Sequence, residues 1–156
     1  MRLFLHQQPM AKDLRAVSAA MRMVSDMERI GDQAADIAEL SRWIIAHDSQ
    51  SKVSLTDMAE ETKKMVIKSV EAFVREDEGL AAEVIAADDK VDELFEKVRE
   101  EIMELIYQKD IDAKASLDLL MAAKYFERIG DHAVNIAEWV EYSITGIHTN
   151  NEHVNQ

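Results

Sequence analysis

The pentapeptide Glu-Arg-Ile-Gly-Asp occurs twice in the chain, at residues 28–32 and again at residues 127–131. Each copy places two carboxylates four positions apart around a glycine. On a helix such carboxylates share one face, and their repulsion costs about 0.2–0.5 kcal/mol per pair. A glycine inside a helix costs about 1 kcal/mol more than an alanine. A cation shared by the carboxylates would offset both costs, and the glycine would let a neighbouring helix approach closely.

The agreement between the two copies extends beyond the pentapeptide, which indicates a duplicated unit. Asp13 aligns with Asp112, and the four residues Ala34, Ile37, Ala38 and Glu39 recur as Ala133, Ile136, Ala137 and Glu138. On a helical wheel the acids of the first copy, which are Glu28, Asp32, Asp36 and Glu39, form a stripe apart from the apolar residues. In the second copy Asn135 stands where the first has Asp36.

A third group of acids lies between the two copies, where Asp88, Asp89, Asp92 and Glu93 crowd together. If their helix packs antiparallel to the helix of the second copy, the two acidic groups could meet. The candidate metal ligands are therefore Glu28, Asp32, Asp36, Asp88, Asp89, Asp92, Glu127 and Asp131. Ligand sets made only of oxygen select hard ions such as magnesium, calcium, manganese or ferric iron. Zinc also accepts carboxylates.

Two other interpretations of these acids stay open. An acidic helix face is most often simply solvated, and the chain would then be a purely structural helical dimerisation module. Alternatively, a carboxylate-bridged metal pair in a helical bundle could serve a storage or catalytic role. The sequence has no Glu-x-x-His pattern, no glycine-rich phosphate loop and no Ser-His-Asp arrangement, which makes the catalytic alternative the weaker one. His132 follows Asp131 directly and is interpreted as a surface histidine.

The composition favours a single all-α unit. Hydrophobic residues make up 47% of the 156 residues, with one proline and four glycines, which suits long helices better than a sheet with many turns. The formal charge of −13 comes from 31 acidic against 18 basic residues and argues against nucleic acid or anionic lipid as partners. No apolar run approaches the roughly 20 residues of a membrane span. The apolar stretch at the N-terminus is too short for a signal peptide, so we expect a cytoplasmic protein.

Helical periodicity predicts four long helices, at about residues 10–46, 55–75, 80–108 and 113–143. The first helix should bury a stripe centred on Met27 that includes Ala16, Ala20, Met23, Ile30, Ala34, Ile37 and Ala38. The last three helices, with their short connections, should form an up-and-down bundle.

The remaining segments are predicted from turn and cap residues. Pro9 suits the first turn of the first helix, so residues 1–8 would belong to the end of a preceding helix. Residues 47–54 read as a linker in which Ser54 or Thr56 could cap the next helix. Gly146 should end the last helix and begin a tail at residues 146–156.

Three segments resemble the PhoU family of phosphate-uptake regulators. They are Pro-Met-Ala-Lys-Asp-Leu-Arg at residues 9–15, Met-Glu-Arg-Ile-Gly-Asp at 27–32, and Phe-Glu-Arg-Ile-Gly-Asp-His-Ala-Val-Asn-Ile-Ala-Glu at 126–138. The resemblance covers most of residues 1–145. It implies two homologous three-helix bundles whose E/D-x-x-x-D motifs bind multinuclear metal clusters at the surface. It also implies a non-enzymatic adaptor, which represses the phosphate-starvation response by coupling the Pst phosphate transporter to a sensor histidine kinase.

Carried over to this chain, the resemblance makes motif acids of Glu28 and Asp32 in the first copy and of Glu127 and Asp131 in the second. Asp88 and Asp92 fit the D-x-x-x-D pattern on the middle helix, with Asp89 as a neighbouring candidate and Asp36 as an extension of the first motif. The implied ions are iron, zinc, manganese or magnesium. The implied partners are the ATPase subunit of the transporter and the sensor kinase.

The chain is shorter than the family pattern. Residues 1–46 are interpreted as a remnant of the first repeat and residues 55–145 as a complete second repeat. The helix at 10–46 then lacks its usual partners, and an exposed apolar stripe of that length is a liability. This helix must pack on the other three helices or on a second copy of the chain. We expect a homodimer or higher oligomer, with this helix as a candidate for exchange between chains.

Overall fold

The computed structural model describes the backbone of residues 2–44 and 53–147. Side chains are described for residues 10–42 and 53–147. Four helices account for nearly all of these residues: α1 (Arg2–Ile44), α2 (Leu55–Arg75), α3 (Glu78–Tyr107) and α4 (Ala113–Thr145). The all-α prediction is confirmed. The linker at 47–52 and the tail from 148 onward lie outside the described residues.

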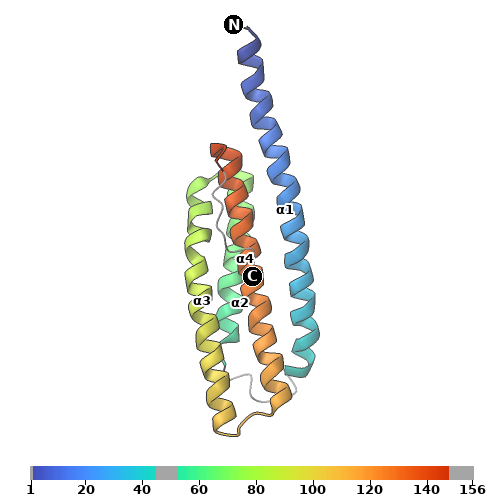
Figure 1. The fold of residues 1–156 in the computed structure, drawn as a ribbon, viewed down its shortest axis with the longest axis vertical. Coiled ribbons are helices and arrows are strands. Elements are labelled where there is room, and N and C mark those ends of the chain that lie inside the picture. The colour runs from blue at the N-terminus through green and yellow to red at the C-terminus, as the bar shows by residue number, and fades with distance from the viewer. Residues whose placement is uncertain (1, 45–52, 148–156) are drawn as a thin grey trace.

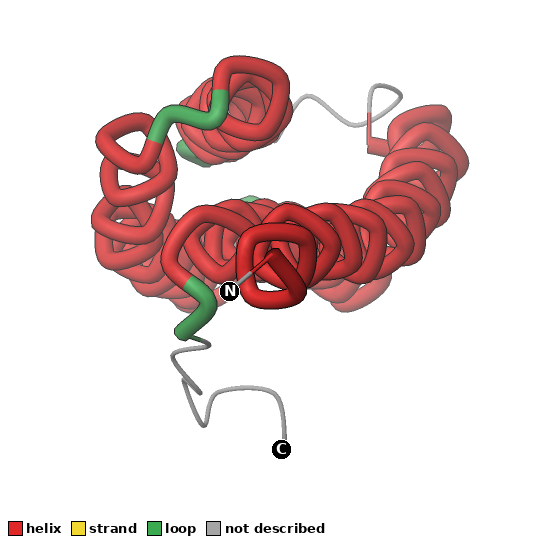
Figure 2. The backbone as a smooth tube through the Cα atoms, turned by 90° about the horizontal axis from the view of Figure 1, so that it is seen from above, coloured by secondary structure: helices red, strands yellow, loops and turns green. Residues whose placement is uncertain are grey.

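The helices run alternately down and up, with α4 at the centre of the arrangement (Figure 1). Helices α2, α3 and α4 pack on one another as a three-helix bundle, and α1 packs chiefly against α4. Seen along the helices, α1 and α3 lie on opposite sides of α4 (Figure 2). The N-terminal end of α1 projects beyond the ends of the other three helices (Figure 1).

Apolar residues at helical spacing build the core of the bundle. On α2 the buried residues are Leu55, Met58, Thr62, Met65, Ser69 and Ala72, which alternate three and four positions apart. On α3 the fully buried Val84, Val91 and Val98 are seven positions apart. Such seams keep one face of each helix toward its neighbours along its whole length. Burying a leucine, methionine or valine side chain in this core stabilises the fold by about 1.5–3 kcal/mol.

The ends of α2 and α4 lie close to the predicted ones. Asp112 caps α4 by accepting a hydrogen bond at Oδ1 from the Ala115 N–H at 2.7 Å, and Gly146 ends it with a left-handed φ of 74°. Ser54 occupies the position before α2 but makes no side-chain cap. Its N–H and its hydroxyl instead donate to the carboxylate of Glu101 on α3, at 2.7 and 2.8 Å. The start of α2 is therefore tied to the far half of α3.

The predicted start of the first helix is wrong. Instead of beginning near residue 10, α1 begins at Arg2 and continues through Pro9. A proline inside a helix lacks one backbone donor, and the carbonyl four residues earlier loses its partner. Here only the carbonyl of Leu5 is affected, close to the end of the helix. Helical residues on both sides of Pro9 therefore remain one element.

The predicted orientation of α1 is also partly wrong. Its most buried residues are Ala19 and Met23, whereas Met27, the expected centre of the buried stripe, is 41% exposed. Ala34 and Ala38 are exposed as well. In this orientation Asp26, the residue before Met27, faces α4 and contacts His132 there. The buried face of α1 thus combines apolar residues with a polar contact across helices.

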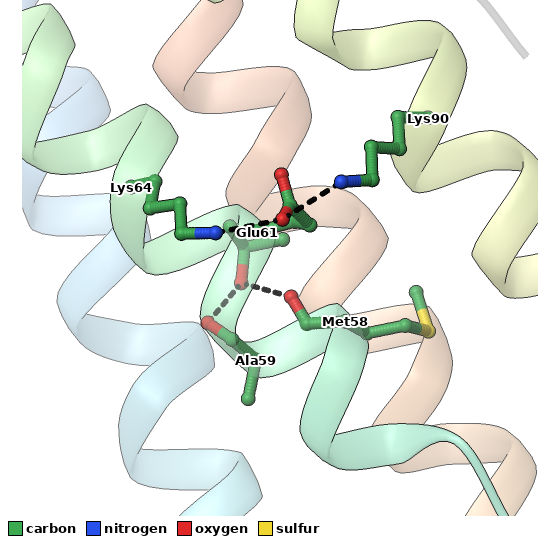
Figure 3. Close-up of polar contacts among 6 residues, drawn as sticks. Met58, Ala59, Glu61, Lys64 and Lys90 are labelled. Carbon is green, nitrogen blue, oxygen red and sulfur yellow. Dashed lines mark hydrogen bonds and ion pairs between the residues drawn. The ribbon is translucent and has the colours of Figure 1, made fainter.

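A three-member ion-pair group joins α2 to α3 at the surface (Figure 3). Lys64 and Lys90 each lie 2.9 Å from Oε1 of Glu61, and Lys90 comes from α3. Their hydrogen bonds lower the pKa of the Glu61 carboxyl below its usual range. Exposed pairs of this kind contribute at most about 1 kcal/mol each to the stability of the fold. Their main effect is to favour one alignment of α2 along α3.

Within the described ranges, no helix is long and apolar enough to cross a membrane.

Candidate metal centre

The second copy of the pentapeptide lies where α4 meets α3. Four carboxylates are close enough there to influence one another: Glu127 and Asp131 on α4, and Asp88 and Asp92 on α3. Partial removal from water and the negative charges of Asp88, Glu127 and Asp92 raise the pKa of Asp131 to about 6. The expected meeting of the two acidic groups therefore occurs. Asp131 still reaches solvent, so an ion could approach from the surface.

Lys124 supplies the balancing positive charge at this face. Its ammonium lies 2.8 Å from Oε2 of Glu127 and 5.4 Å from the centre of the Phe95 ring on α3. The same ammonium lowers the pKa of Asp131 but does not outweigh the acids around it. An ion that entered the group would therefore compete with Lys124 for Glu127.

Gly130 lies where α4 packs against both of its bundle neighbours. A Cβ added at this position would lie 3.6 Å from Val91 on α3 and 3.8 Å from Met65 on α2. These are ordinary contact distances, so a methyl group would fill the space and a larger side chain would collide. The motif glycine of this copy therefore lies at a helix–helix contact, but the spacing there would also admit an alanine.

The first copy of the pentapeptide lies on the exposed side of α1. Glu28 and Asp32 are both exposed, and a Cβ added at Gly31 would meet nothing within 4 Å. No other described helix covers this face. The costly glycine of this copy therefore has no packing reason within the described chain.

Asp36 and Asp89 lie outside the four-carboxylate group. Asp36 lines a cavity of about 190 Å³ between α1 and α4. The other lining residues are Glu39, Leu40, Lys114, Asp118 and Tyr125. Asp89 is exposed on α3. The structure thus brings together half of the predicted ligands and disperses the other half.

The sequence did not reveal the polar contact that joins the two motif helices. Oδ1 of Asp26 lies 3.0 Å from Nδ1 of His132 and accepts a hydrogen bond from Nδ2 of Asn135 at 3.3 Å. The interpretation of His132 as a surface histidine is wrong, since its side chain is only 21% exposed. One signal was available: His132 and Asn135 replace Gln33 and Asp36 of the first copy, and both contact Asp26.

The carboxylates suit a hard cation chemically, but they do not form a closed cage. Among the described residues, no three acidic or histidine side chains converge closely enough to hold an ion as they stand. Burial raises the pKa of Asp131, and the negative charges of Asp88, Glu127 and Asp92 nevertheless add to that effect. If a cation binds here, the candidates to hold it are Asp88, Asp92, Glu127 and Asp131, after their side chains move together.

Comparison with known proteins identifies the family. The family model of the PhoU domain matches residues 1–41 and 55–140. The chain belongs to the PhoU family. It is 33% identical over 147 residues to the phosphate-specific transport system accessory protein PhoU homolog of Clostridium acetobutylicum, over 93% of this chain and 67% of that protein. It is 36% identical over 144 residues to PhoU homolog 1 of Thermotoga maritima, over 88% of this chain and 60% of that protein.

Solved PhoU structures share the fold. The crystal structure of PhoU from Pseudomonas aeruginosa superposes with a TM-score of 0.82 at 32% identity, over 94% of this chain and 71% of that one. PhoU from Streptococcus pneumoniae gives a TM-score of 0.75 at 26% identity, over 89% of this chain and 66% of that one. This PhoU chain thus spans about two thirds of its relatives, whose names describe phosphate-transport accessory and regulatory proteins rather than enzymes.

Proposed function

We propose that this PhoU chain is a non-enzymatic regulator of phosphate uptake that binds a hard metal ion at the α3–α4 acidic face. Membership of a family named for accessory proteins of phosphate-specific transport supports the regulatory role. The observation that supports metal binding is the meeting of Asp88 and Asp92 with Glu127 and Asp131. A bound cation would neutralise carboxylates whose charges otherwise oppose one another.

Proton release couples to ion binding at this face. Because the pKa of Asp131 is raised to about 6, a cation would compete with a proton at that carboxyl. Metal affinity should therefore fall as the pH drops through 6, since a protonated carboxyl is a poor ligand. Iron, manganese, zinc and magnesium are the candidate ions.

Thermal melting of the metal-free chain, with each ion added in turn, tests the metal proposal. A bound ion should raise the melting temperature. Asp131→Asn should abolish that rise, whereas the matched change in the other copy, Asp32→Asn, should preserve it. The proposal fails if the purified chain contains no metal and none of the four ions changes its melting.

The adaptor role is proposed separately. We infer that the chain acts in the cytoplasm and links a Pst-type transporter to a sensor histidine kinase, and its net charge of −13 suits basic partner surfaces. Pull-down with the transporter ATPase subunit and with the kinase should enrich both proteins, and more strongly at low salt. Absence of enrichment under both salt conditions would contradict the adaptor role and leave the metal proposal intact.

A further inference from the structure

Lys124 forms an ion pair inside the acidic face between α3 and α4. Its ammonium lies 2.8 Å from Oε2 of Glu127, whose side chain is only 20% exposed. The same positive charge acts on Asp131, since it lowers the pKa of that carboxyl against the effects of burial and of the neighbouring acids. Lys124 therefore already interacts with two of the carboxylates that an incoming cation would need.

Two other basic side chains on these helices have partners outside the acidic face. Lys90, on α3, lies 2.9 Å from Oε1 of Glu61 on α2. Arg128, on α4, lies 5.9 Å from the centre of the Tyr125 ring. The positive charge that acts on the carboxylates comes instead from Lys124.

Phe95 on α3 helps to hold the Lys124 ammonium at this face. The ammonium lies 5.4 Å from the centre of the Phe95 ring, within the range at which a cation is attracted by the ring electrons. Lys124 extends from α4, so its contacts with Glu127 and Phe95 span both helices of the acidic face. The ammonium is therefore held in place from two sides.

The first copy of the pentapeptide lacks this lysine. Ser25 stands three residues before Glu28, whereas Lys124 stands three residues before Glu127. A serine hydroxyl carries no charge at neutral pH. The added positive charge therefore belongs to the copy whose acids meet further acids from a neighbouring helix.

We propose that Lys124 is the resident counter-ion of the α3–α4 acidic face, and that a hard cation binds there by displacing its ammonium from Glu127. The inference rests on the proposed metal binding and adds the residue that opposes it. In the metal-free chain the ammonium offsets part of the repulsion among the carboxylates. A divalent ion has to separate Lys124 from Glu127 before that carboxylate can turn to it. Lys124 thus sets the ion concentration at which the face fills.

Titration of the intact chain with Mn²⁺ tests this role in two matched variants, Lys124→Met and Lys64→Met. Lys64 suits the control because it also pairs with a glutamate three residues away, at 2.9 Å from Glu61, but on α2. Both variants lose one positive charge. Lys124→Met should tighten Mn²⁺ binding about tenfold and lower the melting temperature of the metal-free chain. Lys64→Met should leave the Mn²⁺ affinity close to that of the wild type.

The opposite signs of these two effects distinguish a counter-ion from a residue that only supports the fold. Loss of a merely structural contact would lower the melting temperature without tightening ion binding. Lys124→Arg keeps the positive charge and should therefore retain the wild-type Mn²⁺ affinity. Equal tightening by Lys124→Arg and Lys124→Met would show that the charge is not the cause, and would overturn the proposal.

The pattern of Mn²⁺ binding also separates this inference from the metal proposal. Equal affinity of the wild type and Lys124→Met would overturn the counter-ion role and leave metal binding intact. Binding by Lys124→Met but not by the wild type would support the counter-ion role and contradict metal binding by the wild-type chain. Binding by neither chain would overturn both.

Discussion

The two copies of Glu-Arg-Ile-Gly-Asp have the same residues but different surroundings. In α4 the glycine is buried against Val91 and Met65, and the two acids face further acids from α3. In α1 the glycine has open space around it, and the acids face solvent. The pentapeptide alone therefore does not make a site. The neighbouring helices decide whether its glycine and its carboxylates have a role in the folded chain.

Two of the three differences between residues 28–39 and residues 127–138 lie where the two helices meet. The residues His132 and Asn135, which replace Gln33 and Asp36, both contact Asp26. An aspartate at position 135 would place a second carboxylate beside Asp26. The amide of Asn135 can donate a hydrogen bond there instead. The loss of one motif acid in the second copy thus has a structural reason.

The largest contrast between the copies should come from enlarging the glycines. Gly130→Leu should lower the free energy of unfolding by about 3 kcal/mol, because its side chain would press into Val91 and Met65. Gly31→Leu should raise it by about 0.5–1 kcal/mol, because leucine favours the helix and has room. Urea denaturation of both variants measures the difference. Equal effects at the two sites would contradict the packing described for Gly130.

A smaller effect is expected from restoring the missing acid. Asn135→Asp should cost about 1–2 kcal/mol at pH 7, because it removes a donor and places two carboxylates together. The cost should shrink as the pH falls and the pair takes up a proton. Asp36→Asn, at the equivalent position of the first copy, should change stability by less than about 0.5 kcal/mol. Denaturation at pH 7 and pH 4 would show whether the contact of Asp26 with Asn135 requires an amide.

The smallest contrast is expected between Asp131 and Asp32, which occupy the same position in the two copies of the pentapeptide. The pKa of Asp131 in the folded chain, about 6, lies above the value of about 4 for an unfolded chain. The folded state therefore binds this proton more tightly, and the resulting stabilisation is lost as the pH rises through 6. Asp131→Asn should match the wild type near pH 4 and exceed it by about 0.5–1 kcal/mol near pH 8, a gain limited by solvent screening.

The matched control for that experiment is Asp32→Asn. This exposed change should shift the free energy of unfolding by less than about 0.5 kcal/mol at both pH values. If both variants followed the same pH dependence, the crowding of acids around Asp131 would not be the cause.

Much of the fold could be predicted from the sequence because local signals are strong in long helices. The bounds of α2 and the stop at Gly146 followed from periodicity and end residues. The rotation of α1 could not be predicted, because this helix has apolar residues on two opposite faces. The contacts of α1 with α4 decide between them, and one of these, between Asp26 and His132, joins residues 106 positions apart.

The candidate site was predicted for one copy only. The D-x-x-x-D spacing on α3 indicated that Asp88 and Asp92 could meet the acids of α4, and they do. The identical spacing in α1 gave the same expectation for Glu28 and Asp32. It could not show that no described helix lies opposite them, since spacing reports which residues share a face and not what covers it.

Because α4 lies at the centre of the fold, α1 should separate from it more often than the three bundle helices separate from one another. Undocking α4 breaks its contacts with three helices, whereas undocking α1 chiefly breaks its contact with α4. The bonds of Asp26 and the stacking of Arg22 over Trp139 at 5.5 Å would open together, while α2, α3 and α4 stay assembled. Backbone amides at 28–32 should then exchange with solvent through this partial opening, and those at 127–131 only through global unfolding.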